Sequence, residues 1–555
     1  MSQDFNEEKS SHKLELLRRK EEEESVKILS QKYKLPYVNL GLLPIEIDAL
    51  KIIPEEKSRL AEIVVVQTAG KKLKIAVRNP EKEETKKVLK NLEEQNYTYD
   101  LFLVSKDSLE HVWQLYKKIP AGKETYTGSI EIAHEKIASL EKEITRVEEV
   151  KQLVEKTFFG KTTEALEIIL GGALATETSD VHIEPQEKEA RLRFRLDGVL
   201  YDVVSLPQKL YALLLSRIKL ISELKLNVHD KAQDGRFTIK TDHSDMEVRT
   251  SILPGPDGEN VVLRILNPKT INVPFEELGM QPWVINTLEQ ELKKPNGMII
   301  TTGPTGSGKT TTLYAFLKKV HTPTIKVITI EDPIEYRLPG IEQTQADAEK
   351  GYDFAVGLRS ILRQDPDVIL VGEIRDLETA ETALHASLTG HLVFSTLHTN
   401  DAAGTIPRLI DLGAKPAIIA PAINITMAQR LVRKLCTSCR VTKKLSSADK
   451  NQIKKELALF PKGIPVPPEN SWKIYSSSPQ GCDACNQTGY KGRIGVFEII
   501  QINEALEQII LRDPSEFEIK KTAADQGQIN IRQDGILKVL AGITDFDELE
   551  RVVGV

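Results

Sequence analysis

The chain has 555 residues, with 75 Lys and Arg against 81 Asp and Glu, a formal net charge of -6, and only 5% aromatic residues. This composition excludes a globally basic, aromatic-rich surface, so direct binding of nucleic acid is not expected. The length predicts about three or four domains. The sequence shows no signal peptide and no apolar run close to the roughly 18 residues that span a bilayer, so we expect a cytoplasmic protein. Residues 1–24 are highly charged and lack an apolar period, so we interpret them as a charged arm with no catalytic role.

The next part of the chain predicts a small α/β or α+β domain followed by a linker. Within residues 25–118, helix-like stretches alternate with short apolar runs at residues 62–66 and 73–77. Residues 119–150 begin with Ile-Pro-Ala-Gly and then become charged, as expected for a tether between domains that move. We expect the first domain to dock to a partner protein.

Two further domains are predicted from residue 151 onward. In residues 151–275, an Ala- and Leu-rich helix (Lys161–Glu177) precedes Arg191–Leu196, whose alternation places three arginines on one face of a strand. After this domain, apolar strand candidates recur with helical segments between them, which predicts a parallel α/β core over residues 276–430. The strand candidates are Met298–Thr302, Val327–Ile330, Asp367–Val371 and Leu392–Thr396.

A phosphate-binding loop is predicted at Gly303–Thr310, which reads GPTGSGKT between a strand candidate (MIITT) and a helix candidate (TTLYAFLKKV). Glycines let backbone N–H groups surround phosphate oxygens, and the helix N-terminus adds its positive dipole end. We expect Lys309 to reach the β and γ phosphates of ATP and the Thr310 hydroxyl to bind Mg²⁺. The predicted nucleotide-binding residues are Gly303, Pro304, Thr305, Gly306, Ser307, Gly308, Lys309, Thr310 and Thr311.

Carboxylates follow two of the predicted strands. DVILVGEIR brings Glu373 to the end of one strand, and Val327–Ile330 is followed by Glu331, Asp332 and Glu335. One of these acids is expected to orient the attacking water, although acids at strand ends also cap helices or lie on the surface.

Two histidines lie on either side of another predicted strand. GHLVFSTLHTN places His391 before the apolar run and His398 after it. His398 could donate a hydrogen bond to a γ phosphate and report its presence, while a purely structural histidine is the alternative.

All four cysteines fall into two C-x-x-C pairs. Cys436 and Cys439 are separated from Cys482 and Cys485 by 42 residues. Four thiolates arranged in this way match tetrahedral zinc, and a site filled by four protein ligands is structural because no position is open to water. Four reduced thiols without metal are the alternative.

Together these residues resemble the type II secretion and type IV pilus-assembly ATPases, from about residue 151 to the end and more weakly through residues 25–118. The motifs that carry the resemblance are GPTGSGKTTTLY, ITIEDPIEY, RQDPDVILVGEIRD and TGHLVFSTLHTNDA. The resemblance implies an α/β multidomain fold with a RecA-like P-loop ATPase core. It places a PAS-like, arginine-bearing domain before that core at residues 151–275, a tetracysteine zinc element at residues 431–500 and a helical region at residues 501–555.

The resemblance also implies roles for particular residues. Glu335 becomes the water-orienting carboxylate, Glu373 the Walker B acid, and His391 and His398 the His-box pair. The stretches SDVHIEP, RLRFRLDGVL, QDGRF and MEVRTSILP nominate Arg236 and Arg249 as contacts from the preceding domain to the nucleotide. An arginine that arrives on domain closure would neutralise charge in the phosphoryl-transfer transition state, whereas pairing with surface acids is the alternative.

By the same resemblance, the chain is expected to be a homohexameric motor that uses ATP to drive assembly of a type IV pilus or a type II secretion pseudopilus. Its partners would be inner-membrane platform and cytoplasmic assembly proteins that recruit it to the inner face of the cytoplasmic membrane. The tetracysteine element favours an extension or secretion motor over a retraction motor. Some family members bind cyclic di-GMP through a repeat not found cleanly in residues 25–118, so docking is the preferred role there. A DNA-uptake pilus motor and a nucleotide-dependent scaffold without turnover are the alternative functions.

Overall fold

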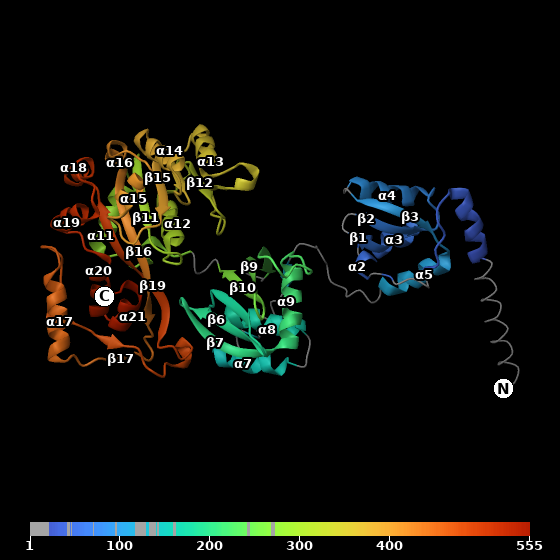
Figure 1. Cartoon of the computed structure of the whole chain (residues 1–555), viewed down its shortest axis with the longest axis horizontal. Coiled ribbons are helices and arrows are strands. Elements are labelled where there is room, and N and C mark those ends of the chain that lie inside the picture. Colours follow the sequence, from blue (N-terminus) through green and yellow to red (C-terminus); the bar gives the residue numbers. More distant parts are fainter. Residues whose placement is uncertain are drawn as a thin grey trace. The chain divides into compact units, whose positions relative to one another are not determined.

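The computed structural model shows two compact units, Met1–Thr125 and Tyr126–Val555 (Figure 1). Of the charged arm predicted for residues 1–24, residues 22–24 belong to a helix over residues 22–33, and the remainder lies outside the described residues. No helix among the described residues is long and apolar enough to cross a membrane. The structure describes residues 22–40, 45, 47–50, 52–69, 72–94, 97–116, 129–131, 140, 144–158, 162–240, 245–267 and 272–554.

The first unit is built on a three-stranded sheet of order β1-β2-β3, in which β1 and β2 are antiparallel and β2 and β3 are parallel. Ile63 and Val65 pack into one apolar cluster, and Val64 and Val66 pack into another. Successive side chains of a strand point to opposite faces, so burial of both faces explains the uninterrupted apolar run. The two short apolar runs at residues 62–66 and 73–77 lie largely in β1 and β2. The elements are α2 (Ile47–Leu50), α3 (Glu55–Ala61), β1 (Ile63–Ala69), β2 (Lys72–Val77), α4 (Glu83–Glu94), β3 (Thr98–Leu103) and α5 (Lys106–Leu115).

The second unit begins with a seven-stranded sheet of order β4-β8-β9-β10-β5-β6-β7, called here the sheet domain. Its core contains Leu192 and Phe194 of β6 together with helical residues such as Val150 and Leu166, while arginines alternate on the other face of β6, as predicted. Leu140 and Ile144, from the stretch expected to be a linker, also contribute to this core. The elements are β4 (Ser129–Glu131), α7 (Val147–Lys156), α8 (Thr162–Ala175), β5 (Asp180–Pro185), β6 (Glu189–Leu196), β7 (Val199–Pro207), α9 (Gln208–Ile221), β8 (Gln233–Lys240), β9 (Asp245–Gly255) and β10 (Gly258–Leu266).

The motor domain that follows has another seven-stranded sheet, of order β13-β12-β14-β15-β11-β16-β19. All neighbouring strands from β13 to β16 are parallel, and β19 is antiparallel to β16. Two large apolar clusters occupy the two faces of the sheet, so β11, β14 and β15 are buried along their whole lengths. The predicted α/β class and the four predicted strands are confirmed.

The strands of the motor domain are β11 (Gly297–Thr302), β12 (Val327–Glu331), β13 (Glu342–Gln345), β14 (Val368–Val371), β15 (Leu392–Leu397), β16 (Ile423–Leu435) and β19 (Tyr490–Gln501). Its helices and helical turns are η3 (Phe275–Glu277), α11 (Pro282–Glu291), α12 (Lys309–Val320), η4 (Ala348–Lys350), α13 (Phe354–Ile361), η5 (Leu362–Gln364), α14 (Leu377–Leu388), α15 (Thr405–Asp411) and α16 (Pro416–Ala422).

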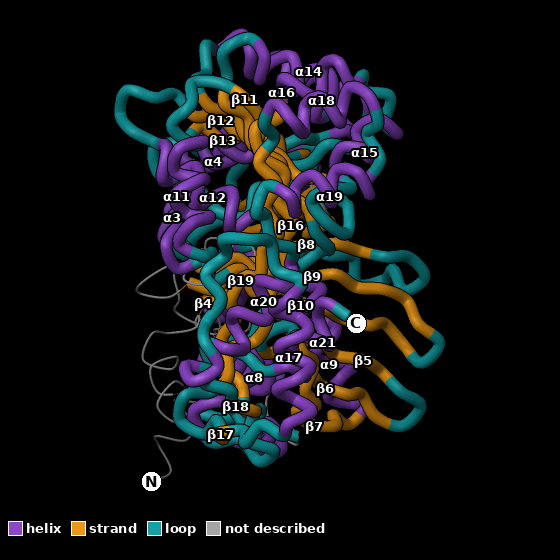
Figure 2. The backbone as a smooth tube through the Cα atoms, turned by 90° about the vertical axis from the view of Figure 1, so that its left-hand side faces the viewer, coloured by secondary structure: helices purple, strands orange, loops and turns teal. Residues whose placement is uncertain are grey.

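The C-terminal part adds helices, of which α20 and α21 contact β16 and β19, and a separate two-stranded sheet of β17 and β18 (Figure 2). Ile453 of α17 packs with Ile536 and Val539 of α20 and with Leu549 of α21 in one apolar cluster. The insertion between the two cysteine pairs is therefore anchored to the C-terminal helices. The elements are β17 (Val441–Thr442), α17 (Ser447–Ala458), η6 (Glu469–Ser471), β18 (Tyr475–Ser476), η7 (Asp483–Cys485), α18 (Glu504–Arg512), α19 (Glu516–Asp525), α20 (Ile531–Leu540) and α21 (Phe546–Val553).

A largely buried arginine joins three parts of the second unit. Arg433 on β16 donates from Nε and Nη2 to Glu548 of α21, at 3.0 and 2.8 Å, and from Nη1 to the Tyr201 hydroxyl of β7 at 3.2 Å. Its guanidinium also lies 3.9 Å from the ring centroid of Tyr490. Burial favours a raised pKa for Glu548, but the hydrogen bonds from Arg551 and Arg433 outweigh it and hold this pKa below its usual value.

We expect Glu548→Gln to lower the free energy of unfolding by about 3 kcal/mol at neutral pH, because it leaves the largely buried Arg433 without its counter-charge. A carboxylate with a depressed pKa stabilises above its unfolded pKa, about 4.3, and loses that effect as pH falls through the folded pKa. The gap between wild type and variant should therefore persist from pH 7 to about pH 5 and narrow below about pH 4.

Denaturant unfolding over this pH range measures the difference in the free energy of unfolding between wild type and Glu548→Gln. Glu550→Gln is the matched control, because Glu550 lies on the same helix and pairs with Arg532 at 3.0 Å with a more exposed side chain. It should cost less than about 1 kcal/mol. If the loss of unfolding free energy in Glu548→Gln stayed constant with pH, Glu548 would not have the depressed pKa that we attribute to Arg433 and Arg551.

Candidate active site and metal centre

The loop between β11 and α12 is held in a shape that only glycine permits at two positions. Gly303 has φ 142°, and a Cβ there would lie 2.5 Å from the carbonyl oxygen of Gln429. Gly308 has φ 90°, and its Cβ would lie 2.8 Å from Nε2 of Gln429. The loop therefore packs closely against β16 and opens directly into the first turn of α12, where free N–H groups and the helix dipole favour an anion.

Lys309 begins α12, and its ammonium group lies against the loop. Its Nζ donates to the carbonyl oxygens of Gly303, at 2.7 Å, and Pro304, at 3.2 Å. Burial lowers the pKa of Lys309, and the positive charge of Arg430 lowers it further. The negative charge of Glu373 acts in the opposite direction. A desolvated cation at a helix N-terminus is suited to phosphate oxygens.

The other predicted phosphate-binding residues line the same loop. Pro304, Thr305 and Gly306 are exposed, Ser307 is buried with an unpartnered hydroxyl, and Thr310 and Thr311 are partly exposed in the first turn of α12. The structure thus places all nine predicted residues in one segment, formed by the loop and the first turn of α12.

Glu373 and His398 meet beside this loop. Glu373 follows β14, its carboxylate accepts from Arg375 and lies 3.4 Å from Nε2 of His398, which follows β15. Thr302, at the end of β11, donates from Oγ1 to the carbonyl oxygen of Leu397 at 3.0 Å. Because β11, β14 and β15 are parallel, their carboxyl ends share one edge of the sheet.

His391 lies at the opposite edge. It precedes β15, and its Nδ1 is 3.0 Å from the carbonyl oxygen of Ala386. At about 3.3 Å per residue, the strand between His391 and His398 separates the two histidines by roughly 20 Å. The structure therefore brings only His398 to Glu373.

Glu335 is paired with an arginine of the sheet domain. Nη1 of Arg249 lies 2.8 Å from Oε2 of Glu335, and Nη2 donates to the carbonyl oxygen of Ile334 at 2.9 Å. Burial raises the pKa of Glu335, and the negative charge of Glu331 raises it further. The positive charges of Arg249 and Arg264 act in the opposite direction. A carboxylate with a raised pKa at a contact between two domains has the properties expected of a group that handles a proton or a water molecule.

Three arginines lie side by side across adjacent strands of the sheet domain. Arg236 of β8 is opposite Arg249 of β9, which in turn is opposite Arg264 of β10. Arg236 is exposed, and among the described residues it is Arg249 that pairs with Glu335. Asp180 holds Arg264 through a 2.9 Å contact to Nε.

Arg264 is the residue that sequence reasoning missed. It is the single charged residue in the apolar run VVLRIL, which lacks the strict alternation that singled out the arginines of β6. Its position beside Arg249 depends on the register between β9 and β10.

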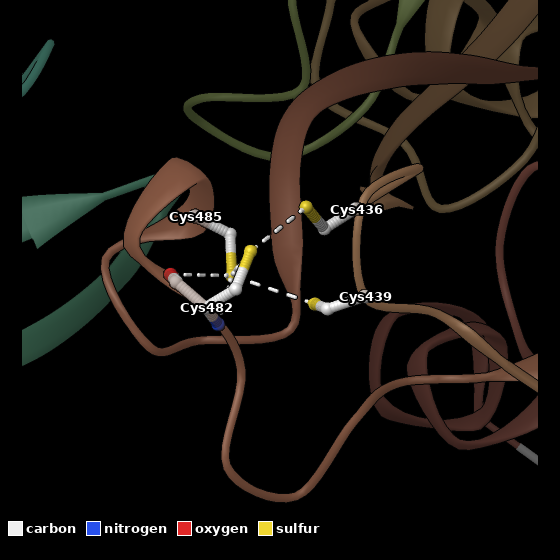
Figure 3. A group of neighbouring side chains, drawn as sticks. All are labelled: Cys436, Cys439, Cys482 and Cys485. Atoms are coloured by element: carbon white, nitrogen blue, oxygen red, sulfur yellow. Dashed lines mark hydrogen bonds between the residues drawn. The ribbon is translucent and has the colours of Figure 1, made fainter.

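The four cysteine sulfurs face one another (Figure 3). All four lie within 4.8 Å of one another, with separations of 3.7 Å for Cys436 and Cys482, 3.8 Å for Cys439 and Cys485, and 3.7 Å for Cys482 and Cys485. Zinc bonded to four sulfurs at about 2.3 Å in a tetrahedron requires sulfur separations of about 3.8 Å. The arrangement fits zinc.

Backbone groups also favour a thiolate at this centre. Burial raises the pKa of Cys485, but N–H groups of Cys482 and Gly489, at 3.2 and 3.3 Å from its sulfur, outweigh this and lower the pKa to about 7. Zinc binds thiolates, so these N–H groups suit the predicted ligand.

The cysteine element also contacts the sheet domain. Asp483, between Cys482 and Cys485, lies 3.1 Å from Nη1 of Arg146, which immediately precedes α7. Gly492, near the start of β19, donates its N–H to Asp197 at 2.8 Å. A cavity of about 290 Å³ lies between these contacts.

Comparison with known proteins agrees with this architecture. The profile of the type II/IV secretion system protein family matches residues 156–551, and the MshEN domain profile matches residues 33–121. The chain is 35% identical over 531 residues to the type IV pilus assembly ATPase PilB of Myxococcus xanthus, covering 95% of this chain and 91% of the relative. It is 43% identical over 384 residues to the type II secretion system protein E of Aeromonas hydrophila, covering 69% of this chain and 74% of the relative. The Legionella pneumophila ATPase DotB has the same fold, with a TM-score of 0.50 at 21% identity over 70% of this chain and 94% of that chain.

The phosphate loop on a parallel sheet, with carboxylates at the neighbouring strand ends, defines an ATP-hydrolysing enzyme of the P-loop class. The chain belongs to the type II/IV secretion system protein family. The resemblance drawn from its motifs and the expectation of an enzyme are both confirmed.

The sulfur geometry predicts close to one zinc per chain by elemental analysis of the purified protein. Cys439→Ser should release the metal and lower the thermal midpoint, because the centre closes the insertion of 42 residues between the cysteine pairs. ATP affinity should stay within about twofold, since a tenfold change would need 1.4 kcal/mol at a distant site.

The control is Ser446→Ala, which removes the N-cap of α17 within the same insertion and leaves the sulfurs untouched. It should retain the zinc. A metal-free protein with four titratable thiols and wild-type stability would disprove the zinc centre.

Proposed function

We propose that this chain is a motor that hydrolyses MgATP and converts the reaction into movement between its sheet domain and its motor domain. Lys309 binds the β and γ phosphates, and Thr310 binds Mg²⁺. Glu335 orients the attacking water and His398 contacts the γ phosphate. Glu373 would help to hold Mg²⁺ and its water at the edge of the sheet, where the ion would neutralise phosphate charge. Water attacks the γ phosphorus, the bond to the β-phosphate oxygen breaks, and ADP and phosphate leave.

The contact between Arg249 and Glu335 is the observation that carries this proposal. Arg249 comes from the sheet domain and Glu335 from the motor domain, and their side chains lie 2.8 Å apart. A residue that orients water is thus linked to the position of another domain, so domain movement and hydrolysis affect each other. Arg264 and Arg236 lie beside Arg249 and are proposed to complete the cationic side of the nucleotide site.

The filament that this motor serves is proposed from the relatives. One relative is named as a type IV pilus assembly ATPase and its match covers 95% of this chain, including the N-terminal domain. The match to the type II secretion protein of Aeromonas hydrophila covers 69% of this chain. The coverage by the pilus relative supports a type IV pilus and the higher identity of 43% to the secretion relative supports a secretion pseudopilus, so the proposal is a motor for one of these two filaments. We propose a cytoplasmic homohexamer recruited by inner-membrane platform and cytoplasmic assembly proteins.

The zinc centre and the domain division belong to the same proposal. Zinc is proposed to be structural, with Cys436, Cys439, Cys482 and Cys485 as its ligands. The matched regions, residues 33–121 and 156–551, support a separate N-terminal domain joined by a linker to the sheet and motor domains.

Lys309→Ala and Glu335→Gln should fail in different ways. Lys309→Ala removes a phosphate ligand and should weaken both ATP binding and turnover. Glu335→Gln keeps the phosphate site, so ATP affinity should be retained while kcat falls by about 100-fold or more. Fluorescent-nucleotide titration and steady-state phosphate release measure the two effects.

Glu342→Gln, a change at an exposed residue of β13 that lies 3.9 Å from Lys326, is the matched control and should behave as wild type. Normal hydrolysis by Glu335→Gln would remove Glu335 from the proposed role and make Glu373 the next candidate.

Arg249→Ala should lower kcat by about 100-fold without unfolding the protein, because it removes a charge that the transition state needs. Arg191→Ala is its control: Arg191 lies in the same sheet and pairs with Glu184 at 3.7 Å and Asp202 at 3.8 Å. Turnover and circular dichroism of the assembled protein are the measurements. Wild-type turnover in Arg249→Ala would exclude this arginine from the site, and Arg236→Ala in the same assay tests its neighbour.

A further inference from the structure

A buried carboxylate lies directly before the loop that carries Glu335. Glu331 is the last residue of β12 and is only 4% exposed. It accepts hydrogen bonds from the Tyr314 hydroxyl, from Oγ1 of Thr329 at 2.6 Å and from Nε2 of Gln343 at 3.1 Å. A buried carboxylate needs such donors, so its three partners are held in fixed positions around it.

Tyr314 connects this carboxylate to the phosphate loop. It lies on α12, the helix that starts at Lys309, and its side chain is fully buried. Burial and the adjacent Glu331 raise the pKa of Tyr314, which keeps its hydroxyl protonated and able to donate. Its ring meets the ring of Tyr336 edge to face, with centroids 4.9 Å apart.

Gln343 of β13 holds the other side of the same loop. Its Nε2 donates to the carbonyl oxygen of Tyr336 at 3.2 Å as well as to Glu331, and its Oε1 accepts from the N–H of Leu338 at 2.7 Å. One amide thus fixes backbone or side-chain atoms on both sides of Glu335.

These contacts form a rigid connection from the phosphate loop to the carboxylate proposed to orient water. A shift of α12 carries Tyr314 with it, and Tyr314 touches the residues on both sides of the segment 332–335. In close-packed interiors such shifts pass to neighbours, because voids are not tolerated. Breaking one hydrogen bond to Glu331 leaves a buried carboxylate short of a donor, and the loop must then rearrange.

We propose that Tyr314 and Gln343 are positioning residues for ATP hydrolysis, which act through Glu331 to set the place of Glu335 relative to the nucleotide. This inference rests on the proposed role of Glu335. Neither side chain is required to touch the nucleotide. Their effect is therefore expected on turnover and not on ATP affinity.

Tyr314→Phe tests this inference with the least disturbance, because the ring and its contact with Tyr336 remain and only the hydroxyl is lost. We expect kcat of the full-length protein to fall by about 10- to 100-fold, the range that a small misplacement of a reacting group produces. The KM and the dissociation constant for ATP should change by less than about twofold, as uniform binding is untouched. Gln343→Met should have the same signature.

Tyr352→Phe is the matched control. The Tyr352 hydroxyl accepts from Oγ1 of Thr344, at 3.2 Å, next to Gln343 in the sequence. This variant also removes one tyrosine hydroxyl near β13 but leaves Glu331 and its donors in place, so its kcat should equal that of wild type. Thermal unfolding of all variants separates positioning from a general loss of stability.

A double variant decides whether Tyr314 acts through Glu335. If it does, adding Tyr314→Phe to Glu335→Gln should change the single-turnover rate by less than about twofold, because the carboxylate being positioned is already gone. A further loss of about tenfold or more in the double variant would overturn the inference, as would a wild-type kcat in Tyr314→Phe.

The outcomes also separate this inference from the function on which it rests. Wild-type hydrolysis in Glu335→Gln would disprove the role of Glu335 and the inference with it. An inactive Glu335→Gln beside a fully active Tyr314→Phe would disprove the inference alone. A loss of ATP affinity at unchanged kcat in Tyr314→Phe would show that Tyr314 shapes the phosphate loop and does not position Glu335.

Discussion

The parallel pairing of β11, β12, β14 and β15 is the constraint on which the candidate site depends. Parallel strands place their carboxyl ends at one edge, so segments distant in the sequence meet there. The phosphate loop follows β11, the loop with Glu335 follows β12, Glu373 follows β14 and His398 follows β15. Burial of both faces of the sheet holds this edge in place, because a shift of one strand would disturb the close packing of side chains on both faces.

Charge links the two domains of the second unit at this edge. Burial raises the pKa of Glu335, and Arg249 and Arg264 of the sheet domain oppose it. The electrostatic state of this carboxylate therefore depends on the contact between domains, which is the property a motor needs. Another contact between the same domains is made by Arg433, which joins Tyr201 of the sheet domain to Glu548 of the C-terminal helices.

The cysteine element contributes to the same interface between domains. Asp483 lies between two of the cysteines and also contacts Arg146 of the sheet domain. A metal that draws Cys482 and Cys485 together would hold the turn that presents Asp483. The centre then has a structural effect beyond the insertion that it closes, although it supplies no group to the nucleotide site.

The sequence by itself determined the elements whose signals are local. The loop GPTGSGKT with its flanking strand and helix, the apolar strands with acids at their ends, and the paired cysteines all depend on short-range pattern or spacing, and the structure has them as predicted. Tertiary structure alone decided which side chains meet. The pairing of Arg249 with Glu335, the position of Arg264 beside Arg249, the separation of His391 from His398 across the sheet, and the bridge from Tyr314 through Glu331 to Gln343 arise from strand register and domain contact. These are interactions between residues far apart in the chain, and no local pattern encodes their geometry.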